Sequence, residues 1–150
     1  MAIKIYFKKF LESLPAYIPE YQTPECAGLD LCSSSTEPIV LNPSEYKLIP
    51  TNLIIELPKG FEAQIRPRSG LALKYGVTVL NSPGTIDSDY RGEIKVLLIN
   101  HGKSHFIINQ GDRIAQMIIS EYVKADFIKA SVLSDTHRGN GGYGSTGGMS

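Results

Sequence analysis

The sequence has no surplus of charge of either sign and very few cysteines. Its 150 residues include 15 basic and 15 acidic side chains, so no general basic field is available to attract nucleic acid or an anionic membrane. Any anion site must therefore be local. Two cysteines, Cys26 and Cys32, are too few for a disulfide framework or an unaided zinc site, and reduced intracellular thiols are expected.

Long apolar runs are also missing. No segment approaches the roughly 20 apolar residues that span a bilayer, and Met1–Lys4 does not open a signal peptide. We expect a soluble, cytoplasmic protein. A chain of this length fits one domain and buries roughly two-thirds of its unfolded surface.

Short extended segments predict an all-β fold. Ile3, Ile5 and Phe7 alternate with less apolar residues, which is the period of a half-buried strand. Further strands are predicted at residues 26–32, 39–41, 46–49, 53–57, 61–65, 77–80, 94–99, 105–108, 113–119 and 127–133. Many short strands separated by turns indicate a sandwich or a barrel. In the segment 26–32, the pattern predicts that Asp30 points away from the apolar face.

One short helix interrupts the strands. Leu71–Lys74 are good helix formers, Ser69 can cap their start, and Gly76 can end the helix in a left-handed conformation. The N-terminus would combine free amide donors with the Arg68 guanidinium, which suits an anion. The alternative is a capped surface helix with an unrelated arginine.

The stretch from Pro83 to Asn100 combines polar groups with a rigid support. Turn residues, two acids and Tyr90 precede the apolar run Ile94–Ile99, and a stable strand holds such groups at fixed positions. A solvated hairpin turn around Asp87–Asp89 explains the same residues.

Gln116 is the only polar side chain between Ile114 and Ile119. An unpaired buried amide costs about 1–3 kcal/mol, so it needs a partner from the protein or from a ligand. The histidines have no mutual spacing of metal ligands and are expected to be solvated: His101, His105 and His137.

The C-terminal residues 138–148 are rich in glycine and cannot pack a core. An arginine, a tyrosine and a Ser-Thr pair stand among glycines that let the backbone approach a ligand closely. Gly139 and Gly144 have the separation of P-loop glycines, but Ser145 stands where that motif requires lysine. We predict a mobile arm that becomes ordered over bound phosphates.

Five segments together resemble the ordered motifs of the trimeric dUTPases, the dUTP diphosphatases. They are Ala27–Asp30, Pro67–Gly70, Gly84–Gly92, Gly111–Gln116 and Arg138–Thr146. One such motif would be weak, but five in order, covering the chain from Cys26 to Thr146, are specific.

The resemblance implies a distorted jelly roll with one short helix, with residues 1–136 as the β domain and residues 137–150 as a C-terminal arm. It also implies a homotrimer with shared active sites, Mg²⁺ as cofactor, and no nucleic-acid or membrane partner. The implied reaction is attack of water on the α-phosphorus of dUTP, which releases dUMP and pyrophosphate. This reaction supplies dUMP for thymidylate synthesis and keeps uracil out of DNA.

For the nucleoside, the resemblance implies that Asp87 holds and polarises the water and contacts the sugar 3′-hydroxyl. Because a carboxylate is a weak base, alignment should matter at least as much as proton removal. Tyr90 would lie under the deoxyribose and fill the space that a ribose 2′-hydroxyl needs. Asn81 and main-chain groups would read uracil, in a hairpin too narrow for the methyl group of thymine. These main-chain groups belong to Gly84, Thr85, Ile86 and Lys95, and the Lys95 side chain is expected to be replaceable.

For the phosphates, the resemblance assigns Arg68, Ser69, Gly70 and Gln116 to direct contact. Asp30 would reach Mg²⁺ through water, since magnesium often keeps several waters and takes other ligands from substrate phosphates. Two further residues, Asp112 and Arg113, would support the site.

In the arm, Arg138, Ser145 and Thr146 would contact the terminal phosphates, and Tyr143 would stack on uracil beside Gly144. The family usually has phenylalanine at the position of Tyr143. Tyrosine also stacks, so we expect Tyr143 to keep the stacking role. The change from phenylalanine bears on how strongly the arm closes over the nucleotide.

Two alternatives remain open. A deaminase resembling dCTP deaminase would need a glutamate near the base, and Glu93 is the only acid close by, although no such role is expected there. A nucleotide-binding protein without catalysis would keep the same fold.

Overall fold

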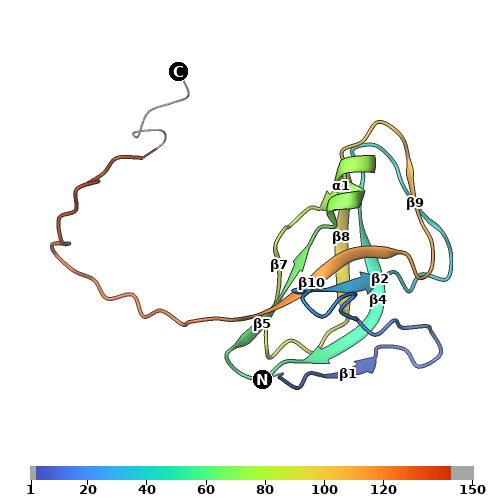
Figure 1. Ribbon diagram of the computed structural model, residues 1–150, viewed down its shortest axis with the longest axis horizontal. Helices are drawn as coiled ribbons and strands as arrows, with labels where there is room; N and C mark the ends of the chain where they lie inside the picture. The colour runs from blue at the N-terminus through green and yellow to red at the C-terminus, as the bar shows by residue number, and fades with distance from the viewer. Residues whose placement is uncertain (1–2, 143–150) are drawn as a thin grey trace.

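The structure of the chain, a computed structural model, describes residues 3–142. Figure 1 shows short strands with one helix, α1, at one end. The elements are β1 (Tyr6–Lys9), β2 (Gly28–Cys32), β3 (Ile39–Leu41), β4 (Tyr46–Glu56), β5 (Phe61–Arg66), α1 (Ser69–Tyr75), β6 (Val77–Val79), β7 (Gly84–Ile86), β8 (Ile94–Asn100), β9 (Phe106–Ile108) and β10 (Arg113–Glu121). In the part of the chain described, no helix is long and apolar enough to cross a membrane.

Two antiparallel sheets of four strands enclose the core. One has the order β1-β4-β8-β6 and the other β2-β10-β5-β7, while β3 pairs with β9. Alternate residues of β8, from Ile94 to Leu98, are at most 1% exposed and share one apolar cluster with Ile65 of β5 and Met117 of β10. Fully burying such a side chain stabilises the fold by about 1.5–3 kcal/mol. The predicted all-β fold with one short helix is confirmed.

The strand β4 differs from the prediction of two strands separated by Pro50. It runs unbroken for 11 residues, because a bulge absorbs the irregularity: pairing with β8 shifts between Pro50 and Leu53. The hydroxyl of Thr51 donates to the carbonyl of Ile94 at 2.6 Å. This bond replaces part of the backbone hydrogen bonding between β4 and β8 that the bulge interrupts. Asn52 stands in the bulge with φ 58°, a conformation that asparagine tolerates better than most residues.

The helix begins one residue earlier than predicted, at the residue expected to be its cap. Arg68 is the N-cap residue and makes no side-chain capping bond, so Ser69 is the first helical residue and does not cap. The predicted end is confirmed, because Gly76 is left-handed with φ 69° and its N–H donates to the carbonyl of Ala72 at 3.0 Å.

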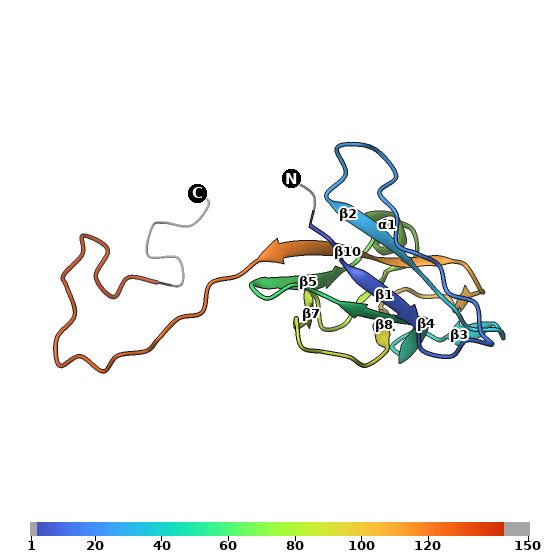
Figure 2. The ribbon, with the colours of Figure 1, turned by 90° about the horizontal axis from the view of Figure 1, so that it is seen from below.

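The strand predicted for residues 127–133 is not present. The chain leaves the sheets after Glu121 and runs away from them in an extended path, as both Figure 1 and Figure 2 show. Phe127 is 100% exposed. The apolar residues there have the composition of a strand, but no neighbouring strand among residues 3–142 pairs with them. The division of the chain at residues 136 and 137 stays a prediction.

Substitution of Gly76 by alanine should destabilise the fold more than the same change at Gly60. Both glycines have positive φ, which costs alanine about 1–2 kcal/mol. A Cβ at Gly76 would also lie 2.7 Å from the backbone nitrogen of Gly102, whereas at Gly60 nothing lies within 4 Å. Overpacking adds about 1–3 kcal/mol. Urea unfolding of the two variants measures the difference, and equal losses would contradict the close packing at Gly76.

Candidate active site

The strands β7 and β8 are consecutive in the chain but belong to different sheets. β7 is an edge strand that pairs only with β5. β8 pairs with β4, but its other edge meets β6 only from Leu98 to Asn100. Among residues 3–142, no strand pairs with the free edge of β7 or with the β6 side of Ile94–Val96. The predicted hairpin is therefore not a hydrogen-bonded ladder, and its backbone donors and acceptors are available to a ligand.

The turn between these strands fixes Tyr90. Its N–H donates to the carbonyl of Asp87 at 3.1 Å, and its hydroxyl donates to the carbonyl of Glu93 at 3.1 Å. A Cβ added at Gly92 would overlap that hydroxyl, so the ring needs glycine at this position. The Asp87 carboxylate is exposed at the start of the same turn.

A first cavity of about 420 Å³, here called the strand pocket, opens beside this turn. It is lined by Phe10, Leu48, Thr85, Ile86, Asp87, Tyr90, Glu93 and Lys95. Five of these residues were predicted to bind the nucleoside. Phe10, Leu48 and Glu93 were not.

Glu93 is a buried carboxylate at the wall of the strand pocket. Its side chain is 8% exposed, and its Oε2 lies 3.4 Å from Nζ of Lys95. Its Oε1 accepts the backbone N–H of Asn52 at 2.9 Å. An acid is almost never buried without partners, and here the partner on β4 lies 41 residues away in the chain, so no local pattern could have revealed it.

A second cavity of about 430 Å³, the helix pocket, lies between α1 and the β2 and β10 strands. Its lining includes Asp30, Arg68, Ser69, Gly70, Gln116 and Tyr75. Gln116 lies opposite Asp30 in the β2–β10 ladder. Its Nε2 donates to the carbonyl of Pro67 at 3.0 Å, which supplies the partner that the sequence demanded. A Cβ at Gly28 would overlap its Oε1.

The Asp30 carboxylate is held between two arginines. Its Oδ1 lies 3.2 Å from Nε of Arg68 and its Oδ2 lies 3.5 Å from a guanidinium nitrogen of Arg113. Arg68 also donates to the backbone carbonyl of Arg113 at 3.2 Å. The Asp30 side chain is 15% exposed and points away from the apolar face, as predicted. This arrangement fixes the Arg68 guanidinium at the pocket.

Both cysteines are free thiols, as predicted. Cys26 lines the helix pocket. Burial raises the pKa of the Cys32 thiol above its ordinary value, and the nearby Asp30 carboxylate raises it further. Cys32 therefore carries little thiolate near neutral pH.

The structure brings the predicted residues together in two groups, because the strand pocket and the helix pocket share no lining residue. Asn81 lines neither pocket, but its Nδ2 lies 3.2 Å from the position of a Cβ at Gly84. It therefore contacts the start of β7.

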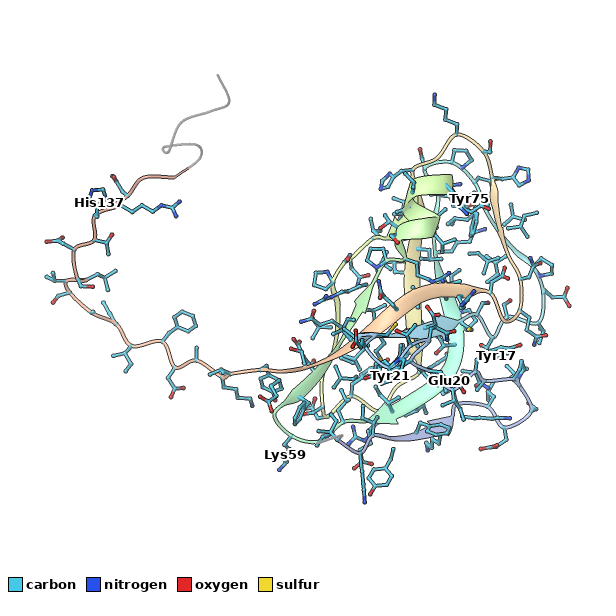
Figure 3. The ribbon with its side chains drawn as sticks, viewed as in Figure 1. Tyr17, Glu20, Tyr21, Lys59, Tyr75 and His137 are labelled. Atoms are coloured by element: carbon cyan, nitrogen blue, oxygen red, sulfur yellow. The ribbon has the colours of Figure 1, made fainter. Side chains whose placement is uncertain are left out.

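Arg138 lies apart from both pockets. Its Nε donates to the carbonyl of Gly141 at 2.8 Å, which closes a local turn. Figure 3 shows its neighbour His137 on the extended segment, well away from Tyr75 of α1. Four predicted arm residues lie outside the described residues: Tyr143, Gly144, Ser145 and Thr146. All three histidines are exposed, and residues 3–142 contain no group of three or more metal-ligating side chains.

Comparison with known proteins gives a consistent result. The dUTPase family model matches residues 15–147. The deoxyuridine 5′-triphosphate nucleotidohydrolase of Rickettsia felis is 57% identical over 139 residues, which cover 93% of this chain and 94% of that protein.

Two solved structures share the fold. The dUTPase of Staphylococcus bacteriophage 80alpha, solved with dUPNHPP, has a TM-score of 0.85 at 23% identity and covers 97% of this chain and 99% of its own. A variant of the dUTPase from phage phi11 of S. aureus, with asparagine in place of one aspartate and a structural Mg(II) ion, has a TM-score of 0.79 at 21% identity over 89% of this chain and 100% of its own.

Replacement of Glu93 by alanine should lower the free energy of unfolding by about 1–3 kcal/mol, because the buried N–H of Asn52 loses its acceptor. Glu93→Gln keeps an acceptor oxygen and should lose less than half as much. Lys95→Met removes only a half-exposed ion-pair partner and should cost under about 1 kcal/mol. Urea unfolding ranks the three variants, and a Glu93→Ala protein as stable as the parent would show that Asn52 finds another acceptor.

Proposed function

The chain belongs to the dUTPase family, and from this premise we propose how its residues divide the reaction between two half-sites. The protein hydrolyses dUTP to dUMP and pyrophosphate. We assign the nucleoside to the strand pocket and the phosphates to the helix pocket. The observation that carries this assignment is that the two predicted sets of ligand groups line two different cavities.

Uracil is read mainly by main-chain groups in this proposal. The free edges of β7 and of β8 near Lys95 offer both N–H and C=O groups to the edge of the base, with Asn81 beside Gly84. A narrow space between the strands excludes the methyl group of thymine. The half-exposed side chain of Lys95 forms an ion pair with Glu93. Because base recognition uses the main chain of Lys95, this side chain can be replaced without loss of base recognition.

Tyr90 selects the sugar and Asp87 aligns the water. The ring of Tyr90 is fixed at both its N–H and its hydroxyl, so it forms a rigid floor that leaves no room for a ribose 2′-hydroxyl. The exposed Asp87 carboxylate accepts hydrogen bonds from the attacking water and the 3′-hydroxyl. Water then attacks the α-phosphorus in line with departing pyrophosphate, a reaction that depends on positioning and charge neutralisation.

The phosphates bind at Arg68, at the start of α1 with Ser69 and Gly70, and at Gln116. Arg68 presents a charge-assisted donor that Asp30 already holds in position. Arg113 supports it through the same carboxylate, and Asp112 supports the loop by accepting the N–H of Asn109 at 2.7 Å.

Mg²⁺ fits this site as an ion carried by the substrate. Both Asp30 oxygens already face guanidinium groups, which favours contact through water over direct ligation. The triphosphate would provide most ligands, as is usual for magnesium. When bound, the ion neutralises phosphate charge.

We propose a homotrimer with shared sites, and the division of the predicted residues between two cavities supports it. If the strand pocket of one copy faces the helix pocket of its neighbour, one nucleotide can fill both. In this proposal the C-terminal arm, residues 137–150, closes over a site through Arg138, Tyr143, Gly144, Ser145 and Thr146. We place the enzyme in the cytoplasm, where its product supplies thymidylate synthesis and its activity keeps uracil out of DNA.

The substrate assignment is tested by pyrophosphate release from dUTP, dCTP, dTTP and UTP in the presence of Mg²⁺. We expect dUTP to be preferred by at least about 10²-fold in kcat/KM. The hydrogen-bonding edge rejects cytosine, the narrow space between the strands rejects the methyl group of thymine, and the Tyr90 ring rejects the ribose of UTP. Asp87→Asn should lower kcat by about 10²–10⁴-fold.

Two other results would point to the alternative functions. Ammonia released from dCTP would indicate a deaminase, although both oxygens of Glu93 already have partners. Binding without turnover in the parent protein would indicate a nucleotide-binding protein.

Shared sites are tested by mixing two inactive chains. Asp87→Asn damages only the strand pocket and Arg68→Ala only the helix pocket. After unfolding and refolding together in equal amounts, about a quarter of the sites should combine two intact halves and recover activity. Each variant refolded alone is the control. No recovery in the mixture would place a whole site within one chain.

A further inference from the structure

The N-terminal segment lies outside the matched family region but contributes to the strand pocket. The family model begins at residue 15. Phe10, in the loop after β1, nevertheless lines the same cavity as Asp87 and Tyr90. This part of the wall is therefore supplied by residues of this chain that the family model does not cover.

The β1–β4 ladder holds residues 6–9, and the side chain of Asn52 holds the residues that follow Phe10. Oδ1 of Asn52 accepts the N–H of Leu11 at 2.8 Å. Its Nδ2 lies 3.0–3.1 Å from the carbonyls of Leu11, Leu14 and Pro15. The N–H of Phe10 donates to the backbone carbonyl of Asn52 at 3.0 Å. Asn52 is 1% exposed, so these bonds are shielded from water and define the path of residues 10–15.

The hydrogen bonds between Asn52 and residues 10–15, here called the clamp, are connected to side chains that line the strand pocket. The N–H of Asn52 donates to Glu93, and Glu93 pairs with Lys95. Glu93, Lys95 and Phe10 all line the strand pocket. The position of the Phe10 ring is thus set by the same bulge of β4 that anchors the start of β8.

The Phe10 ring is 51% exposed, although its backbone is firmly held. Phe7, on β1, is 50% exposed and lines a different, smaller cavity of about 140 Å³ with Tyr6 and Ile54. The two rings are equal in size and nearly equal in exposure, and they differ in what they border. Of the two, Phe10 borders the place where the nucleoside is proposed to bind.

We propose that Phe10 is a nucleoside-binding residue, whose ring contacts the deoxyribose and uracil of the substrate in the strand pocket, and that Asn52 is the positioning residue that presents it. The inference rests on the proposed assignment of the nucleoside to this pocket. An aromatic ring fixed at the wall contacts the nucleoside without the cost of ordering a flexible loop. Such a ring can stack on the base or make apolar contact with it.

The test measures dUMP binding by calorimetry and steady-state dUTP hydrolysis with the full-length chain. dUMP lacks the outer phosphates and so reports on the nucleoside half. Phe10→Ala should weaken dUMP binding about 10-fold and raise KM similarly, with kcat within about twofold because the contact is made equally in the ground and transition states. Phe10→Tyr keeps the ring and should bind as the parent does. Phe7→Ala is the matched control and should also bind as the parent does.

Asn52→Gly tests the clamp. Glycine accepts the positive φ but removes every side-chain bond to residues 11–15. It should reproduce the rise in KM of Phe10→Ala with kcat again preserved, a split that a general loss of stability would not produce.

Several outcomes would overturn the inference. Unchanged dUMP binding in Phe10→Ala would do so, as would equal losses in Phe10→Ala and Phe7→Ala. A change of oligomeric state in Phe10→Ala by sedimentation would assign the ring to contact between copies instead. A parent protein that binds dUMP through Phe10 but does not hydrolyse dUTP would refute the proposed reaction and leave the inference standing. A parent protein that hydrolyses dUTP without binding dUMP would refute the inference alone, and one that neither binds dUMP nor hydrolyses dUTP would refute both.

Discussion

The site depends on the way that the backbone of β8 is shared between two neighbours. One edge of β8 is paired with β4, which fixes the strand in the core, while the other edge meets β6 only at its far end. β7 is drawn into the second sheet by β5. Buried backbone groups are normally paired, so two adjacent edges without strand partners among the described residues form an unusual place in an antiparallel fold. The strand pocket lies there, lined by Thr85 and Ile86 of β7 and by Lys95 of β8.

Local patterns in the sequence predicted most of the strands and the family motifs. The apolar runs that predicted β8 and β10 reflect the place of these strands in the core, where Leu98 and Met117 are buried. Gly76 ends the helix because the left-handed conformation suits glycine. Pro50 was misleading because proline usually ends a strand, and the bulge that accommodates it depends on Thr51 reaching β8. Residues 127–133 have a strand composition, but a strand also needs a neighbour, which composition does not reveal.

The lining of the two cavities was predictable where it comes from local motifs and unpredictable where it depends on long-range contacts. Asp87, Tyr90, Arg68 and Gln116 all stand in short motifs, and each lines one of the two cavities. The role of Glu93 depends on a backbone N–H on another strand. Phe10 reaches the pocket from the loop after β1, which is bonded to the backbone and the side chain of Asn52. Neither contact leaves a periodic signal, since both join segments about 40 residues apart.

The ion pairs of Asp30 bear on how this protein evolves. A cavity that binds an anion must keep cationic groups together even when it is empty, and such groups repel each other, which is one origin of the conflict between activity and stability. Here Asp30 lies between Arg68 and Arg113, so a carboxylate offsets part of their repulsion even when no ligand is bound. In the proposed site, the carboxylate that positions Arg68 for the phosphates also stabilises the empty protein. The durability of the protein and its activity then depend on one side chain.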